Sequence, residues 1–512
     1  MGRGRHRSLC IRSAERGPAI HDPPAWSRRD WVAIALVTVA GAAVRVAGMT
    51  TPGGLVFDEI FYARNACRFV VDSAQCGIDD LVSGAHPPLG NWLIGIGIRL
   101  FGYDEFGWRI ASAVAGTLTV ALLYLLVRRL LAGHVPAPAA TVGATAAAAL
   151  LATDFLHLVQ SRVAMLDSFV TLFVVAAVLC MLLDGGRRRG PRGEDLDTAR
   201  WLRRLALGRP WRLAAGLALG AGIAVKWSGG YVALGLVVLL VAWEVAATRQ
   251  VDGERTEGAV GRAIRRELVP SVVLLGLVPL IVYLGSYTGR VDGDLLALPW
   301  REGSVWRGIA EHQLAMLRFH LGLAGSHPYE SAPWTWLLLK RPVAYSFADG
   351  AGSYREVLAI GNPLTWWPGA VALVAVAVRW VRSGAGLARP ELVLVAAALS
   401  TYLPWLVLSG SRSQVFIWYL LPTIPFLYGA LGLVAALAWR SLGERIGIGV
   451  AAVAVAASFV FFYPILTAAP LSPEDWRSRI WFADCSRSGA PTLTLPDDQI
   501  NQGPPPSGWC WI

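Results

Sequence analysis

Two adjacent carboxylates, Asp58 and Glu59, stand in the apolar and aromatic stretch of residues 54–62. An apolar setting disfavours the charged form of a carboxylate and makes it more basic. A general base that takes a proton from an alcohol needs such a setting, so the pair is a candidate catalytic site. The alternative is a solvated loop, or two acids at a helix N-terminus, where the helix dipole favours negative charge.

Other polar side chains lie at or near the ends of apolar segments. These are Arg45, His86, Asn91, Arg109, Arg162, Asp167 and Lys226. Ionisable groups within membrane spans are costly and usually face a cavity or a partner. We predict that these residues converge with the two carboxylates on one cavity. The alternative is structural pairing, such as Arg162 with Asp167 or Arg45 with Glu59.

Carboxylates and cations together suit the transfer of a sugar from a lipid-linked phosphate to a hydroxyl. The planar guanidinium of Arg162 matches a phosphate, and Lys226 adds charge. A phosphate leaving group needs stabilisation of its charge rather than a general acid. Asp58 would accept the proton of the attacking hydroxyl. A one-step displacement would invert the anomeric centre, unlike the two-step retaining route.

Membrane-spanning helices must position these residues. Of the 512 residues, 55% are hydrophobic and 16% are charged, whereas soluble domains carry about 25% charged residues. Apolar blocks reach the roughly 20 residues that cross a bilayer. We predict about eleven spans, at residues 31–49, 106–131, 139–157, 163–183, 211–226, 229–248, 268–287, 364–382, 390–409, 415–438 and 445–466. The block 88–101 is too short to cross and is expected to lie in the interface or to dip partway in.

Basic residues fall in alternate loops, as membrane topology requires. They account for the net charge of +11, so this charge does not indicate nucleic-acid binding. The pattern predicts a disordered cytoplasmic tail at 1–30 and an extracytoplasmic tail at 467–512. It also places the loops 50–105 and 288–363 outside, on a cell membrane.

The outer segments contain further candidates. Cys67 with Cys76 and Cys485 with Cys510 are possible disulfides in an oxidising compartment, unless they fell there by chance. His327, Tyr329 and Glu330 are candidate substrate-binding residues. His312 and His320 lie two turns apart on one helix face, but no tight ligand spacing supports a metal. Helices that lie flat on the membrane are the favoured structure for this loop.

Ordered motifs resemble one known family, the protein O-mannosyltransferases, in their bacterial, actinobacterial form. The motifs are Phe57-Asp58-Glu59, His86-Pro87-Pro88-Leu89-Gly90, Ser161 to Ser168, Val225-Lys226-Trp227-Ser228, Ser326 to Ser331 with Pro333-Trp334, and Gly361-Asn362-Pro363. They lie in order within residues 31–466, which the resemblance identifies as a GT-C catalytic domain. It implies an all-α integral membrane GT-C fold in which interfacial helices occupy the outer loops.

The resemblance also implies an activity, namely inverting transfer of mannose from polyprenyl phosphate mannose to Ser or Thr of proteins crossing the membrane. Asp58 corresponds to the family's base, and Glu59 to a second required carboxylate. Arg162 corresponds to a residue tied to the donor phosphate, and Arg45 to a further important arginine. We therefore predict that Arg162, Lys226 and Arg45 bind the donor phosphate. The family is thought to need no essential metal.

One departure concerns the acceptor. The loop 288–363 is too short for the β-trefoil insert of eukaryotic relatives, so unfolded secreted chains supplied by the translocation machinery are the expected partners. Two other functions stay open. A related enzyme could transfer the sugar to a lipid or a cell-wall glycan, and a transporter could move polyprenyl-linked sugars. Transporters often have paired halves with broken helices, and the sequence has no such internal symmetry.

Overall fold

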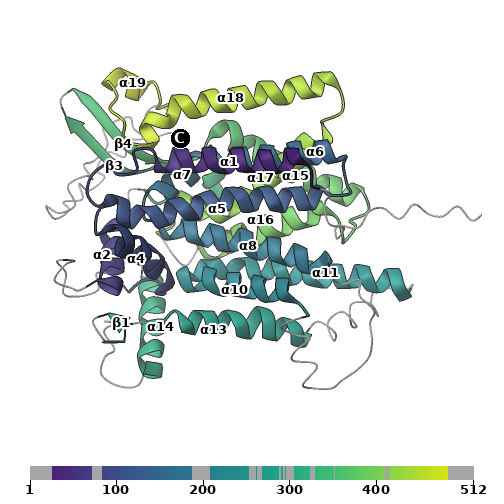
Figure 1. Ribbon diagram of the computed structural model, residues 1–512, viewed down its shortest axis with the longest axis horizontal. Coiled ribbons are helices and arrows are strands. Elements are labelled where there is room, and N and C mark those ends of the chain that lie inside the picture. Colours follow the sequence, from purple (N-terminus) through teal and green to yellow (C-terminus); the bar gives the residue numbers. More distant parts are fainter. Residues whose placement is uncertain are drawn as a thin grey trace, which may run out of the picture.

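The computed structural model describes residues 26–71, 76, 84–186, 208–252, 261, 268–287, 290–291, 294–295, 305–322, 329–350, 352–409 and 414–481. Long helices lie side by side in a bundle (Figure 1). Part of the predicted N-terminal tail, His327, and the Cys485–Cys510 pair with the end of the C-terminal tail lie outside the described residues.

Helices occupy each predicted span. In chain order they are α1 (Arg28–Val46), α5 (Glu105–Leu131), α6 (Ala137–Ala152), α7 (Phe155–Arg162), α8 (Leu166–Gly186), α10 (Pro210–Val225), α11 (Val232–Asp252), η2 with α13 (Val273–Leu277 and Val278–Gly285), α15 (Pro363–Arg382), α16 (Pro390–Leu408), η5 with α17 (Ile417–Thr423 and Ile424–Leu437) and α18 (Leu442–Leu466). Within the described residues, eight helices are long and apolar enough to cross a membrane, or up to nine if α6 and α7, bent by 56°, form one span. The chain is therefore a multi-pass membrane protein, and the number eleven stays a prediction.

Close helix contacts depend on small residues, because burial of apolar surface does not by itself hold helices together in lipid. The crossing of α6 and α17 is one example. A Cβ atom at Gly143 would lie 2.5 Å from the Gly432 carbonyl oxygen, and a Cβ atom at Gly432 would lie 2.5 Å from the Gly143 oxygen. The two backbones therefore touch at this point.

One end of the bundle carries the short elements that build the site. These are α2 (Glu59–Val70), α4 (Leu89–Phe101), α14 (Val305–Gly322), β3 (Val343–Gly350), β4 (Ser353–Ala359) and α19 (Pro473–Arg477), all at the left of Figure 1. The long helix α11 reaches the opposite end. The six short elements at the first end come from the segments 50–105, 288–363 and 467–512, which the sequence predicts to share one membrane face.

The segment 288–363, which is predicted to lie outside, contains both expected and unexpected structure. Helix α14 runs across the direction of the long helices (Figure 1), as a helix lying flat on the membrane would. Strands β3 and β4 form an antiparallel hairpin, with Val343 opposite Ala359 and Gly350 opposite Ser353. Strand β4 also bridges Leu471 through Tyr354. This hairpin was not predicted from the sequence, and neither was the short pair β1 (Arg290–Val291) and β2 (Asp294–Leu295).

Candidate active site

Asp58 lies at the start of a helix in the segment between α1 and α5. It is the N-cap residue of α2, which begins at Glu59. Phe57, which precedes it, has a left-handed backbone (φ 51°) that is unfavourable for a residue with a side chain. Its ring stacks on Tyr345 at 4.3 Å and meets Trp418 edge-on at 5.3 Å. These aromatic contacts hold the turn that presents Asp58.

The Asp58 carboxylate is in a desolvated and electrically mixed setting. Burial raises the pKa of Asp58 to about 6, against a lowering effect of Lys226 and a further raising effect of Asp167. Tyr62, one helical turn away, donates a long hydrogen bond of 3.4 Å to Oδ2. A carboxyl group with this pKa can hold or release a proton near neutral pH.

Glu59 points elsewhere and is fully enclosed. Its two oxygens accept a bidentate pair from Arg109, at 2.8 Å each, and backbone N–H bonds from Val56 (2.8 Å) and Ala164 (2.9 Å). Arg109 also donates to the carbonyls of Met49, Pro52 and Gly54. The Glu59–Arg109 pair thus connects the segment after α1 to α5 and to the residues before α8. The acids at the helix N-terminus therefore have two different environments.

Lys226 and Asp167 form a second charged pair, next to the first. Nζ of Lys226 lies 3.1 and 3.0 Å from the two oxygens of Asp167. It also lies 4.3 Å from the centre of the Tyr419 ring, a favourable position for a cation. Lys226 ends α10, and Asp167 is in the first turn of α8.

Arg45 and Arg162 face the protein interior. Arg45 donates to Ser161 Oγ (2.9 Å) and to the Gly41 carbonyl (2.8 Å), and contacts His157 Nδ1 (2.6 Å). Arg162 donates to four backbone carbonyls of residues 44–48, at 2.6 to 3.1 Å. It therefore satisfies carbonyls that the end of α1 leaves without partners. The pairings considered from sequence were wrong, because Asp167 pairs with Lys226 and Glu59 with Arg109.

His86 lines a cavity of about 190 Å³ together with Lys226. Its ring lies 6.0 Å from Tyr62 and 5.5 Å from His320. Two other groups of residues complete the lining. They are the aromatic and polar residues Trp227, Ser228, Tyr231, His320 and Trp405, and the smaller or aliphatic residues Ala85, Pro87, Leu317, Leu321, Leu408 and Val415. We call this space the first cavity.

Helix α14 is fastened over the first cavity by the two histidines. His312 Nε2 lies 2.8 Å from the Gly84 carbonyl oxygen, and His320 Nε2 lies 3.0 Å from that of Ala85. Their predicted position on one helix face is therefore confirmed. Through them this face contacts the backbone of the segment before His86. Over the part of the chain that the structure describes, no group of three His, Cys, Asp or Glu residues could hold a metal.

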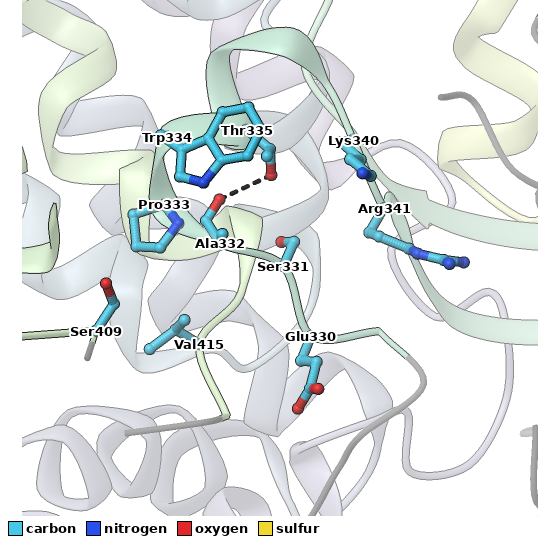
Figure 2. Close-up of a pocket in the computed structure, with 10 residues that line it drawn as sticks. All are labelled: Glu330, Ser331, Ala332, Pro333, Trp334, Thr335, Lys340, Arg341, Ser409 and Val415. Atoms are coloured by element: carbon cyan, nitrogen blue, oxygen red, sulfur yellow. Dashed lines mark hydrogen bonds between the residues drawn. The ribbon is translucent and has the colours of Figure 1, made fainter. Parts of the chain in front are cut away.

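The remaining predicted residues do not line the first cavity. Asn91 is on the buried face of α4, and its Oδ1 has no hydrogen-bond partner among the described residues. Glu330 lines a larger second cavity of about 390 Å³ (Figure 2). Tyr329 is packed at the edge of the core. Cys67 and Cys76 form the expected disulfide, which closes the end of α2.

Two tyrosines near the site, Tyr62 and Tyr345, were not among the candidate residues predicted from the sequence. Tyr62 was detectable, because a residue four positions after Asp58 lies on the same face of a helix. Tyr345 comes from the unpredicted hairpin, and its hydroxyl accepts a 2.5 Å hydrogen bond from Gln160. Its contact with Phe57 brings β3 against the turn at Asp58.

Known proteins share this chain's sequence and architecture. Residues 85–189 match the family model for dolichyl-phosphate-mannose-protein mannosyltransferase, and residues 305–485 match that for the C-terminal four-transmembrane region of protein O-mannosyltransferase. The polyprenol-phosphate-mannose–protein mannosyltransferase of Mycobacterium tuberculosis is 33% identical, over 88% of this chain and 91% of the relative. That of Mycolicibacterium smegmatis is 31% identical, over 91% of this chain and 95% of the relative.

Solved structures give the same fold. The Saccharomyces cerevisiae Pmt1-Pmt2 complex bound to the sugar donor matches 89% of this chain and 92% of the compared chain, with a TM-score of 0.64 at 16% identity. ArnT from Cupriavidus metallidurans, bound to undecaprenyl phosphate, matches 84% and 64%, with a TM-score of 0.50 at 19% identity. The fold is therefore that of the GT-C glycosyltransferases, and the chain belongs to the protein O-mannosyltransferase family.

Proposed function

We propose that this protein transfers mannose from polyprenyl phosphate mannose to Ser or Thr hydroxyls of secreted proteins, at the outer membrane face and with inversion. The observation that carries the proposal is the placement of Asp58. A carboxylate with a pKa of about 6 stands beside a lysine–aspartate pair, next to a cavity between membrane helices. The relatives that cover most of the chain carry the name of this activity.

We assign the lipid donor to the first cavity. The three leucines of its lining are exposed, namely Leu317 (44%), Leu321 (63%) and Leu408 (47%). In a bilayer such side chains face lipid, so a polyprenyl chain could pass between α14 and the end of α16. Lys226 lines the same cavity, and its positive charge would stabilise the phosphate.

The arginines receive a supporting role in this proposal. The sequence and the family resemblance pointed to Arg162 and Arg45 for the donor phosphate, but their guanidinium groups already donate to protein acceptors. Moving either group to a phosphate would leave buried carbonyls unpaired, which is costly. We therefore assign the phosphate to Lys226 and treat the two arginines as residues that position α1 and the segment before α8.

The transfer would proceed in one step. The acceptor hydroxyl oxygen attacks the anomeric carbon from the side opposite the phosphate, and its proton passes to Asp58. The bond between the anomeric carbon and the phosphate oxygen breaks, and polyprenyl phosphate leaves with its added negative charge near Lys226. Asp167 keeps the ammonium group in place, and Asp58 later returns its proton to water.

The outer location rests on charge and arrangement. The arginine-rich loops predict which ends are cytoplasmic, and α2, α4, α14 and the β3–β4 hairpin gather at one end of the bundle (Figure 1). Unfolded chains emerging from the translocation machinery would meet the lipid donor at this end.

A transfer assay tests the proposal. Membranes containing the protein are given radiolabelled polyprenyl phosphate mannose and a Ser/Thr-rich peptide. Label should enter the peptide, and should be lost in Asp58→Asn but kept in the control Glu474→Gln, which changes an exposed carboxylate on α19. NMR of the product should show an anomeric configuration opposite to that of the donor.

Other results would select other functions. Label on lipid or cell-wall glycan, with none on peptide, would indicate a different acceptor. Movement of the donor across the membrane without any transfer would indicate a transporter. Full transfer by Asp58→Asn would show that Asp58 is not the base.

A further inference from the structure

The second cavity adjoins the proposed active site but is not used by the donor. Val415 lines both cavities, so they are neighbours. The chain continues from Val415 to Trp418, which contacts Phe57 beside Asp58, and to Tyr419, which contacts Lys226. A molecule in the second cavity therefore lies along the wall that leads to the base.

The lining of the second cavity combines both charges with hydroxyl groups. Figure 2 shows Glu330 at its lower edge, Lys340 and Arg341 at the upper right, and Ser331 and Ser409 between and opposite them. Trp334 is 63% exposed, so its indole ring offers an apolar face. A site for a bare phosphate would be disfavoured by Glu330, whereas a polypeptide offers amide, carboxylate and apolar groups to such a lining.

Lys340 is an unusual residue in this chain. It is one of only two lysines among 46 basic residues, and the other is Lys226. Each of the two lines one cavity. Among the described residues, no carboxylate lies within ion-pair distance of the exposed Lys340 Nζ. Its charge is therefore available to a bound group.

The backbone at Lys340 is held in an unfavourable conformation. Leu339 and Arg341, on either side, both have φ of 61°, a left-handed conformation that is unfavourable for residues with a side chain and persists only where the surrounding structure imposes it. Leu339 is fully buried, and the Lys340 N–H bonds the Thr335 carbonyl at 3.3 Å. The turn after η3 (Pro333–Leu338) thus sends Leu339 into the core and Lys340 outward.

We propose that the second cavity binds the part of the acceptor polypeptide that flanks the modified hydroxyl, and that Lys340 selects acceptors with a carboxylate at that position. Trp334 would contact an apolar or proline side chain of the same segment, while Ser331 and Ser409 bond its backbone. This inference rests on the proposed function, since it names a second contact of the same acceptor.

Two peptides test the selection. They share one Ser/Thr core and differ only in flanking residues, Asp in one and Lys in the other. With the full-length protein and polyprenyl phosphate mannose, kcat/KM should favour the Asp peptide by about fivefold, the upper range for one exposed ion pair. Lys340→Gln should abolish the preference and Lys340→Glu should reverse it. Arg477→Glu, an exposed change on α19 away from the cavity lining, should keep it.

A binding measurement separates the two proposals. A photoreactive form of the Asp peptide is added to the Asp58→Asn variant, and crosslinks are mapped by mass spectrometry. Crosslinks within residues 330–341 are expected, weakened in Lys340→Glu. Crosslinks there without transfer in the wild-type protein would refute the proposed function and keep the cavity assignment. Transfer with an unchanged peptide preference and no crosslinks there would overturn the cavity assignment. So would a Lys340→Glu effect confined to the KM of the lipid donor, which would make the cavity a lipid-phosphate site.

Discussion

Two groups of charged residues contribute to the candidate site, and they differ in how fully their hydrogen-bonding capacity is used. The first group is Asp58, Asp167 and Lys226, and we call it the cavity group because Lys226 lines the first cavity. The buried group is Arg45, Glu59, Arg109 and Arg162. Every member of the buried group makes several short bonds to protein atoms, and Glu59 alone accepts four. Asp58 accepts one long hydrogen bond, from Tyr62.

The contrast shows how a membrane enzyme can separate structural charges from reactive ones. A buried charge with all its partners in place is expensive to disturb, so it fixes the geometry of the loops. A carboxylate left with few partners and little water has a raised pKa and can still exchange a proton. Adjacent positions in the sequence, 58 and 59, therefore have opposite environments, and under the proposed function they serve opposite purposes.

The largest expected difference between the groups is in activity. Asp58→Asn should lower kcat by a factor of about 100 to 10,000, the usual contribution of a general base. Its thermal stability should be unchanged or raised, because the desolvation that raises the pKa of Asp58 also penalises its charged form. Labelled transfer and thermal unfolding in detergent measure the two quantities. A variant that loses activity only because it unfolds would contradict this assignment.

Glu59→Gln should show the reverse balance, with stability as the primary loss. It leaves the buried Arg109 guanidinium without its carboxylate, and breaking a buried pair costs about 3–5 kcal/mol. Thermal unfolding in detergent checks the loss. The matched control is Glu311→Gln, which breaks the exposed pair with Arg307 and should leave the thermal stability almost unchanged, because solvent screens such a pair. Equal stability of the two variants would show that the Glu59–Arg109 pair does not stabilise the protein.

The sequence predicted the membrane fold because the thickness of the bilayer fixes the length of each apolar segment. This length is a local property that can be recognised without knowing the tertiary structure. The same locality explains why the two histidines of α14 could be placed on one helix face, and why Asp58 could be singled out as a candidate. A carboxylate after an apolar span, and two histidines eight positions apart, are local patterns whose geometry a helix determines. The bend between α6 and α7 and the β3–β4 hairpin depend on packing against distant segments, and neither was predicted.

The partners of the charges could not be predicted for the same physical reason. Glu59 and Arg109 are 50 residues apart, and Asp167 and Lys226 are 59 apart. An arginine near a membrane surface can bind a phosphate, a carboxylate or the carbonyls at a helix end, and composition does not distinguish these uses. Arg162 contacts carbonyls because the end of α1 lies against it, which is a property of the tertiary structure.

A smaller effect is expected when the lysine of the cavity group keeps its charge but changes shape. Lys226→Arg should raise the KM for polyprenyl phosphate mannose roughly tenfold, since a planar fork cannot occupy the same place between Asp167 and the Tyr419 ring as a compact ammonium. The KM for the acceptor peptide should stay constant. Steady-state kinetics with each substrate varied in turn measure both. A change in the acceptor KM alone would place Lys226 on the acceptor side.

The smallest effect should appear only in the pH profile of Tyr62→Phe. The Tyr62 hydroxyl bonds the ionised form of Asp58, so its loss favours the protonated form and raises the pKa of Asp58 further. Because the base must be ionised, kcat/KM of the wild-type protein should fall as the pH drops below about 6. In Tyr62→Phe the fall should begin at a higher pH, by about half a unit for so long a bond, with equal activity at pH 8. An unmoved profile would show that Tyr62 only fills space, and a shift toward lower pH would contradict the assignment of Asp58 as the base.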